Sequence, residues 1–177
     1  LGSPVACSLF CVVGSITTAD VDNNTTIWGV GVDTDLVTAP NERYAIFMGR
    51  VGGDLWLVDS FGGTELLRVD TAEIIFNNGA HSLGGVWQGS GGTAFAYRNG
   101  KDVGSASITG TLSGTGRVCA GGFFNDVTTN STMTIVLGYM WTRALQPSEM
   151  LWLHVEPYAF LRPVIRRRYF VPVAAGE

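Results

Sequence analysis

Cysteine, histidine and lysine are scarce in this chain of 177 residues, which contains three, two and one of them. A structural zinc site needs clustered Cys and His ligands, and three scattered cysteines with two distant histidines do not supply one. Nucleophilic catalysis has little support either, because only His81 and His154 could act as general bases and neither lies in a recognisable nucleophile motif. These shortages exclude two large classes of site.

Long apolar runs are also missing. No uninterrupted apolar segment approaches the ~20 residues that span a bilayer, and no charged leader precedes an apolar segment. Glycine pairs recur along the chain, but none opens a strand, glycine loop and helix unit with a lysine, as phosphate cradles do. We therefore expect a soluble protein without membrane insertion or a nucleotide loop.

The three cysteines do not form a disulfide framework. In a strand, Cys7 and Cys11 lie on one face about 13 Å apart, too far to bond to each other, so with Cys119 at most one pair could form. Cysteine used as a small apolar core residue fits folding in a reducing cytoplasm. This use favours a protein assembled inside a bacterial cell.

What the chain does contain is glycine, with 24 residues, and many Thr, Ser, Asn and Val residues, a composition typical of short strands joined by tight turns. Its length suits one domain. The Asn99-Gly100 pair is the strongest hairpin signal. We expect two antiparallel sheets packed face to face, with strands in residues 4–13, 26–32, 43–49, 54–58, 64–76, 82–88, 93–97, 116–123 and 135–141.

A short helix is predicted directly after the last strand. Residues 135–141 are apolar at nearly every position, which is typical of a strand covered on both faces. Pro147 suits the first helical position, and Glu149 lies where a carboxylate favours the exposed amides and the positive end of the helix dipole. Pro157 is expected to stop the helix.

Two segments carry a family resemblance. The strand-to-helix segment resembles the closing element of laminin G-like or concanavalin A-like jelly-roll domains, and the residues GVW with AYRNGKDVG resemble their central hairpin, although the family's His pair is reduced here to His81. Residues 156–160 are similar to the ending of such domains on bacteriophage structural proteins. The matching residues are Tyr139, Trp141, Arg143, Ala144, Leu145, Ser148, Glu149 and Leu153, together with Val86, Trp87, Tyr97, Asn99, Gly100 and Gly104.

The resemblance implies an all-β jelly-roll sandwich with one short C-terminal helix, and raises the question of glycoside hydrolysis. Hydrolytic relatives use two carboxylates on one strand. Asp20/Asp22 and Asp33/Asp35 have a suitable spacing, but they lie in segments that read as loops and lack the relatives' Glu-x-Asp-x-x-Glu arrangement. We predict that these carboxylates lie in solvent-exposed turns and that the chain has no enzymatic activity.

Binding sites are weakly marked. Some laminin G-like domains hold Ca²⁺ at the sandwich rim, and Asp33 and Asp35 are oxygen donors of the right type, although Asp and Asn also favour turns for their own reasons. Asn125 and Asp126 are the candidate ligand-binding residues for a glycan. The five tryptophans could stack on sugars, but most lie in apolar strands or the helix, where a core role is expected.

Charge is unevenly distributed. Residues 1–161 carry seven basic and fourteen acidic groups, whereas residues 162–177 carry four arginines and one glutamate. We therefore divide the chain into a sandwich, 1–161, and an Arg-rich arm, 162–177. The arginines of the arm are interleaved with apolar residues, which favours docking on an acidic neighbour over binding to nucleic acid. The arginines proposed to bind the partner are Arg162, Arg166, Arg167 and Arg168.

Together these features favour a non-enzymatic binding or decoration module on a phage virion surface. Its expected partners are neighbouring virion subunits, other copies of itself and, as a candidate ligand, a glycan. In the resembling family a further strand precedes the segment that begins here at Pro4, so upstream residues, the tail or a neighbour could complete a sheet. The alternative function is a carbohydrate-binding module of a bacterial secreted or surface protein, which is also an extracellular setting.

Overall fold

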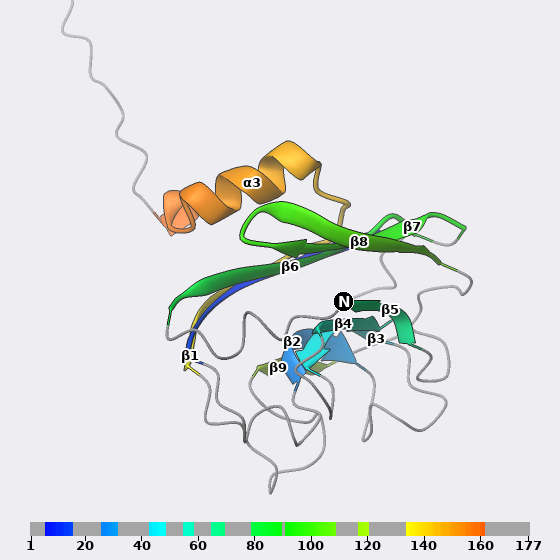
Figure 1. Cartoon of the computed structure of the whole chain (residues 1–177), viewed down its shortest axis with the longest axis horizontal. Helices are drawn as coiled ribbons and strands as arrows, with labels where there is room; N and C mark the ends of the chain where they lie inside the picture. The colour runs from blue at the N-terminus through cyan, green and yellow to red at the C-terminus, as the bar shows by residue number, and fades with distance from the viewer. Residues whose placement is uncertain are drawn as a thin grey trace, which may run out of the picture.

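The computed structural model describes residues 6–15, 26–31, 43–48, 55–58, 65–69, 79–89, 91–108, 117–120 and 134–161. Within these residues the chain forms two five-stranded antiparallel sheets, one α-helix and one short 3-10 helix. The two sheets lie face to face, and the α-helix covers the outer side of one of them (Figure 1). The predicted all-β sandwich with a short C-terminal helix is confirmed.

The first sheet contains the β-strands that position the helix. Its strand order is β10 (Thr134–Trp141), β1 (Cys7–Ser15), β6 (His81–Trp87), β7 (Thr93–Arg98) and β8 (Lys101–Ser107). The second sheet has the order β5 (Glu65–Val69), β4 (Leu55–Val58), β3 (Arg43–Met48), β2 (Thr26–Gly31) and β9 (Arg117–Ala120).

Strand β1 lies between β10 and β6 in the first sheet and is buried on both faces. Alternate residues point to opposite sides of a strand, and Leu9 and Cys11 join the core between the sheets while Phe10 joins the core under the helix. Cys7 and Cys11 are unbonded and buried, and burial raises the pKa of each thiol to about 12. This confirms that they do not bond to each other and that they pack as apolar core residues.

Strand β10, at the edge of the first sheet, is only partly covered on its two faces, and Val136 is 44% exposed, so the burial predicted from its apolar sequence is less complete than in β1. Ile135 packs against the core between the sheets, whereas Leu137 packs against the core under the helix. Gly138 leaves room for the ring of Trp28 on the other sheet, since an added Cβ would lie 2.9 Å from it. The indole N–H of Trp28 donates to the carbonyl of Tyr139 (3.1 Å), which ties the two sheets together.

The turn between β7 and β8 has the predicted geometry. Asn99 and Gly100 both have positive φ, 50° and 74°, as a two-residue turn matched to the twist of paired strands requires. The hairpin of β3 and β4 is also confirmed, and β5 and β9 lie within the segments expected at 64–76 and 116–123, whose other residues fall outside the described ones. Strand β1 continues past the predicted end at residue 13 to Ser15, with irregular pairing to β10.

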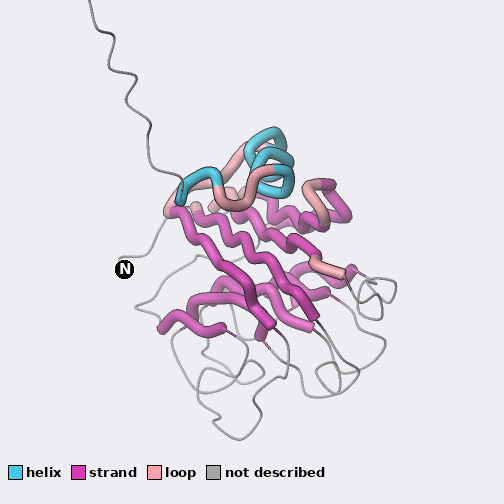
Figure 2. The backbone as a smooth tube through the Cα atoms, turned by 90° about the vertical axis from the view of Figure 1, so that its left-hand side faces the viewer, coloured by secondary structure: helices cyan, strands magenta, loops and turns pink. Residues whose placement is uncertain are grey.

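Helix α3 (Pro147–Val155) runs across the outer face of the first sheet, and η1 (Ala159–Leu161) follows it at the same end of the molecule (Figure 2). Met150 and Leu153 are the fully buried residues of α3 and contact a core that includes Phe10, Val86 and Tyr97. No helix in the described part of the chain is long and apolar enough to cross a membrane.

Candidate attachment surface

Helix α3 begins where the sequence predicts. Pro147 occupies its first position, and the Glu149 carboxylate accepts a hydrogen bond from the backbone N–H of Gln146 (2.8 Å). This bond satisfies an amide just before the first turn, where backbone donors lack helical partners. The helix ends at Val155, two residues before Pro157.

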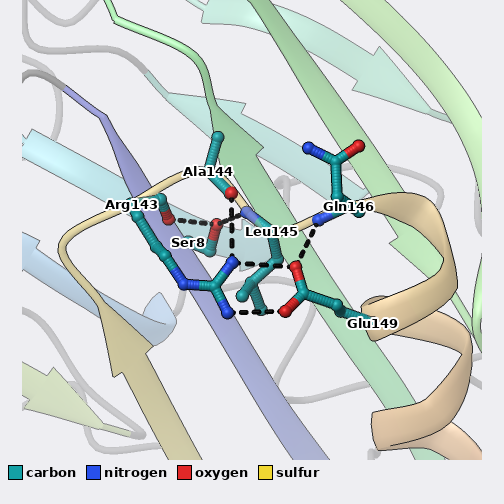
Figure 3. A network of polar contacts seen from close by, with 6 residues as sticks. All are labelled: Ser8, Arg143, Ala144, Leu145, Gln146 and Glu149. Carbon is teal, nitrogen blue, oxygen red and sulfur yellow. Dashed lines mark hydrogen bonds and ion pairs between the residues drawn. The ribbon is translucent and has the colours of Figure 1, made fainter.

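An exposed ion pair reinforces this start. Arg143 donates through both terminal nitrogens to the two carboxylate oxygens of Glu149, and the Nη1 to Oε2 distance is 2.8 Å (Figure 3). The hydrogen bond from Arg143, followed by the one from Gln146, lowers the pKa of Glu149 to about 2. The same hydrogen bond raises the pKa of Arg143. The sequence placed both residues in the family pattern but did not reveal that they pair.

A buried serine fixes the connection between β10 and α3. The hydroxyl of Ser8, on β1, donates to the carbonyl of Arg143 (2.8 Å) and accepts from the N–H of Leu145 (2.8 Å). Ser8 is fully buried, so both partners are satisfied without water. One side chain near the start of the chain therefore sets where the helix departs from the sheet (Figure 3).

A second polar cluster lies under the C-terminal half of α3. Ser82 Oγ and His154 Nδ1 are 3.0 Å apart, and the backbone of Ser82 exchanges hydrogen bonds with Asn99 at 2.8 and 3.1 Å. The Asn99 amide also lies 3.4 Å from His81 Nδ1. Because Ser82 is buried, its hydroxyl is closed to a substrate, and the cluster holds the β7–β8 turn against α3.

The opposite side of α3 is apolar and open to solvent. We call this surface the α3–η1 patch. Its side chains have exposed fractions between 44% and 66%, and they are Leu151, Trp152, Val155, Tyr158, Phe160 and Leu161. Contiguous exposed apolar side chains are unusual on a monomer and mark interaction sites.

Aromatic packing holds the patch in a fixed shape. The ring of Phe160 lies edge-on to Trp152 with centroids 5.1 Å apart, and it also contacts Tyr139 at 5.8 Å and Trp141 at 5.9 Å. The hydroxyl of Tyr139 donates to the carbonyl of Pro157 (2.8 Å), which ties the turn between α3 and η1 to the sheet. The patch is therefore preorganised.

Apart from the tryptophans, none of the residues singled out from the sequence for binding lies in the described part of the chain. Asn125 and Asp126, the calcium candidates Asp33 and Asp35, the pair Asp20/Asp22 and all four arm arginines fall outside it and stay predictions. Among the described residues no group of three or more His, Cys, Asp or Glu side chains could hold a metal ion.

Trp152 departs from the core role expected for most of the tryptophans. Trp87 is fully buried and Trp28 packs partly into the core, whereas Trp152 is 44% exposed. The patch as a whole was not predicted from the sequence, but a signal was present. The helix reads MLWLHV in its last six residues, which is more apolar than the single stripe of Met150 and Leu153 that the sheet buries.

The sequence matches no protein-family model and no curated protein. The fold does match solved structures. A Trypanosoma rangeli sialidase in complex with 2,3-difluorosialic acid matches with a TM-score of 0.61 and 12% identity over 87% of this chain, which spans 23% of the sialidase. The match therefore covers less than a quarter of that enzyme.

Two further structures match over most of their own length. The heptameric SAP-like pentraxin of Limulus polyphemus has a TM-score of 0.60 and 17% identity, covering 87% of this chain and 71% of the pentraxin. The CBM40 of Ruminococcus gnavus IT-sialidase, bound to α2,3-sialyllactose, has a TM-score of 0.59 and 11% identity. The match covers 84% of this chain and 82% of the CBM40. At these identities the likeness establishes a lectin-like β-sandwich fold.

Proposed function

We propose that this chain is a non-enzymatic binding module that attaches to a neighbouring protein subunit through the α3–η1 patch, and that its setting is a phage virion surface. The observation that carries the proposal is the patch itself, six exposed apolar side chains on a rigid aromatic support. The setting is supported by the resemblance of residues 156–160 to the ending of such domains on phage structural proteins.

The patch is suited to a contact that is repeated many times. Full burial of one large apolar side chain contributes ~1.5–3 kcal/mol, so covering six that are already about half buried contributes on the order of 5 kcal/mol. Bringing two partners together costs ~4–15 kcal/mol in lost freedom of motion. Such a contact needs further attachment points or many copies, and a particle surface provides them through effective concentration.

Incorporation into particles tests the proposal. Particles would be assembled with the other structural proteins of the virion and with either the unchanged chain or the Val155→Lys, Leu161→Lys double variant. Both positions are about two-thirds exposed, so the variant keeps its core. We expect its amount in gradient-purified particles to fall at least tenfold, because two charges would have to be buried at the contact.

The matched control is Val136→Lys, which places the same charge at an exposed valine of β10 outside the patch. The control should enter particles as the unchanged chain does. Equal incorporation of the double variant and the unchanged chain would contradict attachment through the patch.

A carbohydrate-binding function is the second candidate, because the CBM40 that matches nearly end to end is bound to α2,3-sialyllactose. A glycan array followed by calorimetry with that trisaccharide tests it. Saturable binding that is lost in the Asn125→Ala, Asp126→Ala variant would favour this function, and no binding to any glycan on the array would count against it.

A glycoside hydrolase is less well supported. On the first sheet, the outer face is filled by apolar side chains such as Phe10 and Leu137, and α3 covers it. An acidic pair of the hydrolytic type has no place on that face. Steady absence of glycan cleavage under conditions where binding is measured would agree with a non-enzymatic module.

A further inference from the structure

We infer that the partner held by the α3–η1 patch is the C-terminal arm, residues 162–177, of a second copy of this chain. The inference rests on the proposed function, since it names what the attachment surface binds. The module then associates with itself by exchanging arms, each copy giving its arm to the patch of the other, which is a contact with two-fold symmetry.

The position of the arm supports this partner. The last residue of η1, Leu161, belongs to the patch and is 65% exposed, and Arg162 follows it directly. Each arm therefore starts at the edge of the α3–η1 patch of its own domain. Its sixteen residues span ~50 Å when extended, at ~3.3 Å per residue, which is far enough to cross a neighbouring molecule.

The arm carries apolar residues that can cover the apolar patch. They form two blocks, Val164-Ile165 and Tyr169-Phe170-Val171, separated by three arginines. In extended chain the facing ends of the blocks lie ~13 Å apart. The exposed apolar side chains of α3 lie within residues 151–155, which span ~6 Å at 1.5 Å per residue, so one block can cover the helix while the other reaches beyond it.

The sequence of the arm favours a second copy over the arm's own domain. A return onto its own patch would require a reversal of the chain soon after η1, and residues 162–175 contain none of the Gly, Asn, Asp or Ser residues that favour tight turns, although Pro163 and Pro172 are present. Pro163 biases Arg162 towards extended backbone, and the β-branched residues Val164 and Ile165 continue that preference. We therefore expect the arm to extend towards a second copy.

Charge adds a long-range attraction between copies. The arm carries a net charge of +3 and residues 1–161 carry −7. Each arm therefore approaches a body of opposite sign, which raises the rate of encounter and weakens with salt.

The test uses the full-length chain and two variants analysed by light scattering after gel filtration. The patch variant is Val155→Lys, Leu161→Lys, and the arm variant is Tyr169→Ser, Phe170→Ser, Val171→Ser. We expect the unchanged chain and the control Val136→Lys to show at least twice the monomer mass of 18.9 kDa, and each variant to elute as a monomer.

Mixing the two variants is the decisive step. The patch variant keeps an intact arm and the arm variant keeps an intact patch, so a 1:1 mixture can form one of the two arm contacts. At high protein concentration its average mass should rise above that of either variant alone. A folded, monomeric unchanged chain, or a mixture that stays monomeric, would overturn arm exchange. If the unchanged chain is monomeric but the patch variant still fails to enter particles, the arm inference fails while the proposed function stands. If incorporation is also unaffected, both fail.

Discussion

Arg143 and Glu149 form a two-pronged ion pair across the start of α3, six residues apart in sequence. The Glu149 carboxylate also accepts from the backbone of Gln146, so one side chain fastens the loop after β10 to the first turn of the helix. This arrangement has a measurable consequence for the pH dependence of stability.

Glu149 has a pKa of about 2 in the folded chain, below its ordinary value of 4.5. A lowered folded-state pKa stabilises the fold above the unfolded-state value, and the contribution is lost as pH falls from about 4.5 towards 2. Glu149→Gln should therefore be slightly less stable than the unchanged chain in urea unfolding at pH 7, because the pair is exposed. The difference between them should shrink steadily between pH 4.5 and 2, and a constant difference over that range would contradict the assignment.

Ser8 is expected to contribute more to the stability of the fold than its small side chain indicates. Replacing it with Ala leaves the Arg143 carbonyl and the Leu145 N–H buried beside a methyl group, and an unsatisfied buried polar group costs ~1–3 kcal/mol. Urea unfolding of Ser8→Ala should show a loss of that size, whereas Ser105→Ala, at an exposed position of β8, should change stability little. Equal stability of the two variants would show that water replaces the serine.

Gly100 lies in the β7–β8 turn against α3. It has a φ of 74°, and an added Cβ would come within 3.0 to 3.1 Å of His154 and Leu151. Gly91 has almost the same φ, 72°, with nothing within 4 Å of the added atom, so it is a matched control for backbone strain alone. Gly91→Ala should cost ~1 kcal/mol in thermal or urea unfolding. Gly100→Ala should lower the free energy of unfolding by clearly more than Gly91→Ala does. Equal losses in the two variants would mean that α3 shifts to make room for the added methyl group at little cost.

The division at residue 161 makes a prediction about the whole arm. The two apolar cores that the structure describes are formed by residues that precede Leu161, so a chain that ends there should keep the near-ultraviolet circular dichroism and the unfolding midpoint of the full chain. Its self-association should be lost. Unfolding of the shortened chain would show that the arm belongs to the sandwich itself.

Local patterns were sufficient to predict most of the described elements of this fold. The turn at Asn99-Gly100, the strand β1 and the start of α3 at Pro147 all depend on residues close in sequence, and all three are confirmed. Strand β8, which follows that turn, was not predicted, because its sequence has no apolar pattern and its strand conformation depends on pairing with β7.

The candidate site depended on contacts that sequence does not mark. Ser8 and Leu145 are 137 residues apart, and nothing in the local sequence of either indicates the hydrogen bond between them. The patch could have been suspected from the apolar surplus in α3, but which apolar residues of the helix face solvent became clear only once Met150 and Leu153 were placed on the sheet. A single sequence shows the periodicity of a helix, but it does not show which of its apolar residues face solvent.

The most direct test of the account is a crosslinking measurement at Val155. The chain would carry a photoreactive phenylalanine analogue at this position, and equal amounts of protein labelled with ¹⁴N and with ¹⁵N would be mixed before irradiation. The account predicts crosslinked peptides that join residues 147–161 of one isotope to residues from 162–177 of the other. Crosslinks confined to chains of a single isotope, or none to the arm at all, would contradict it.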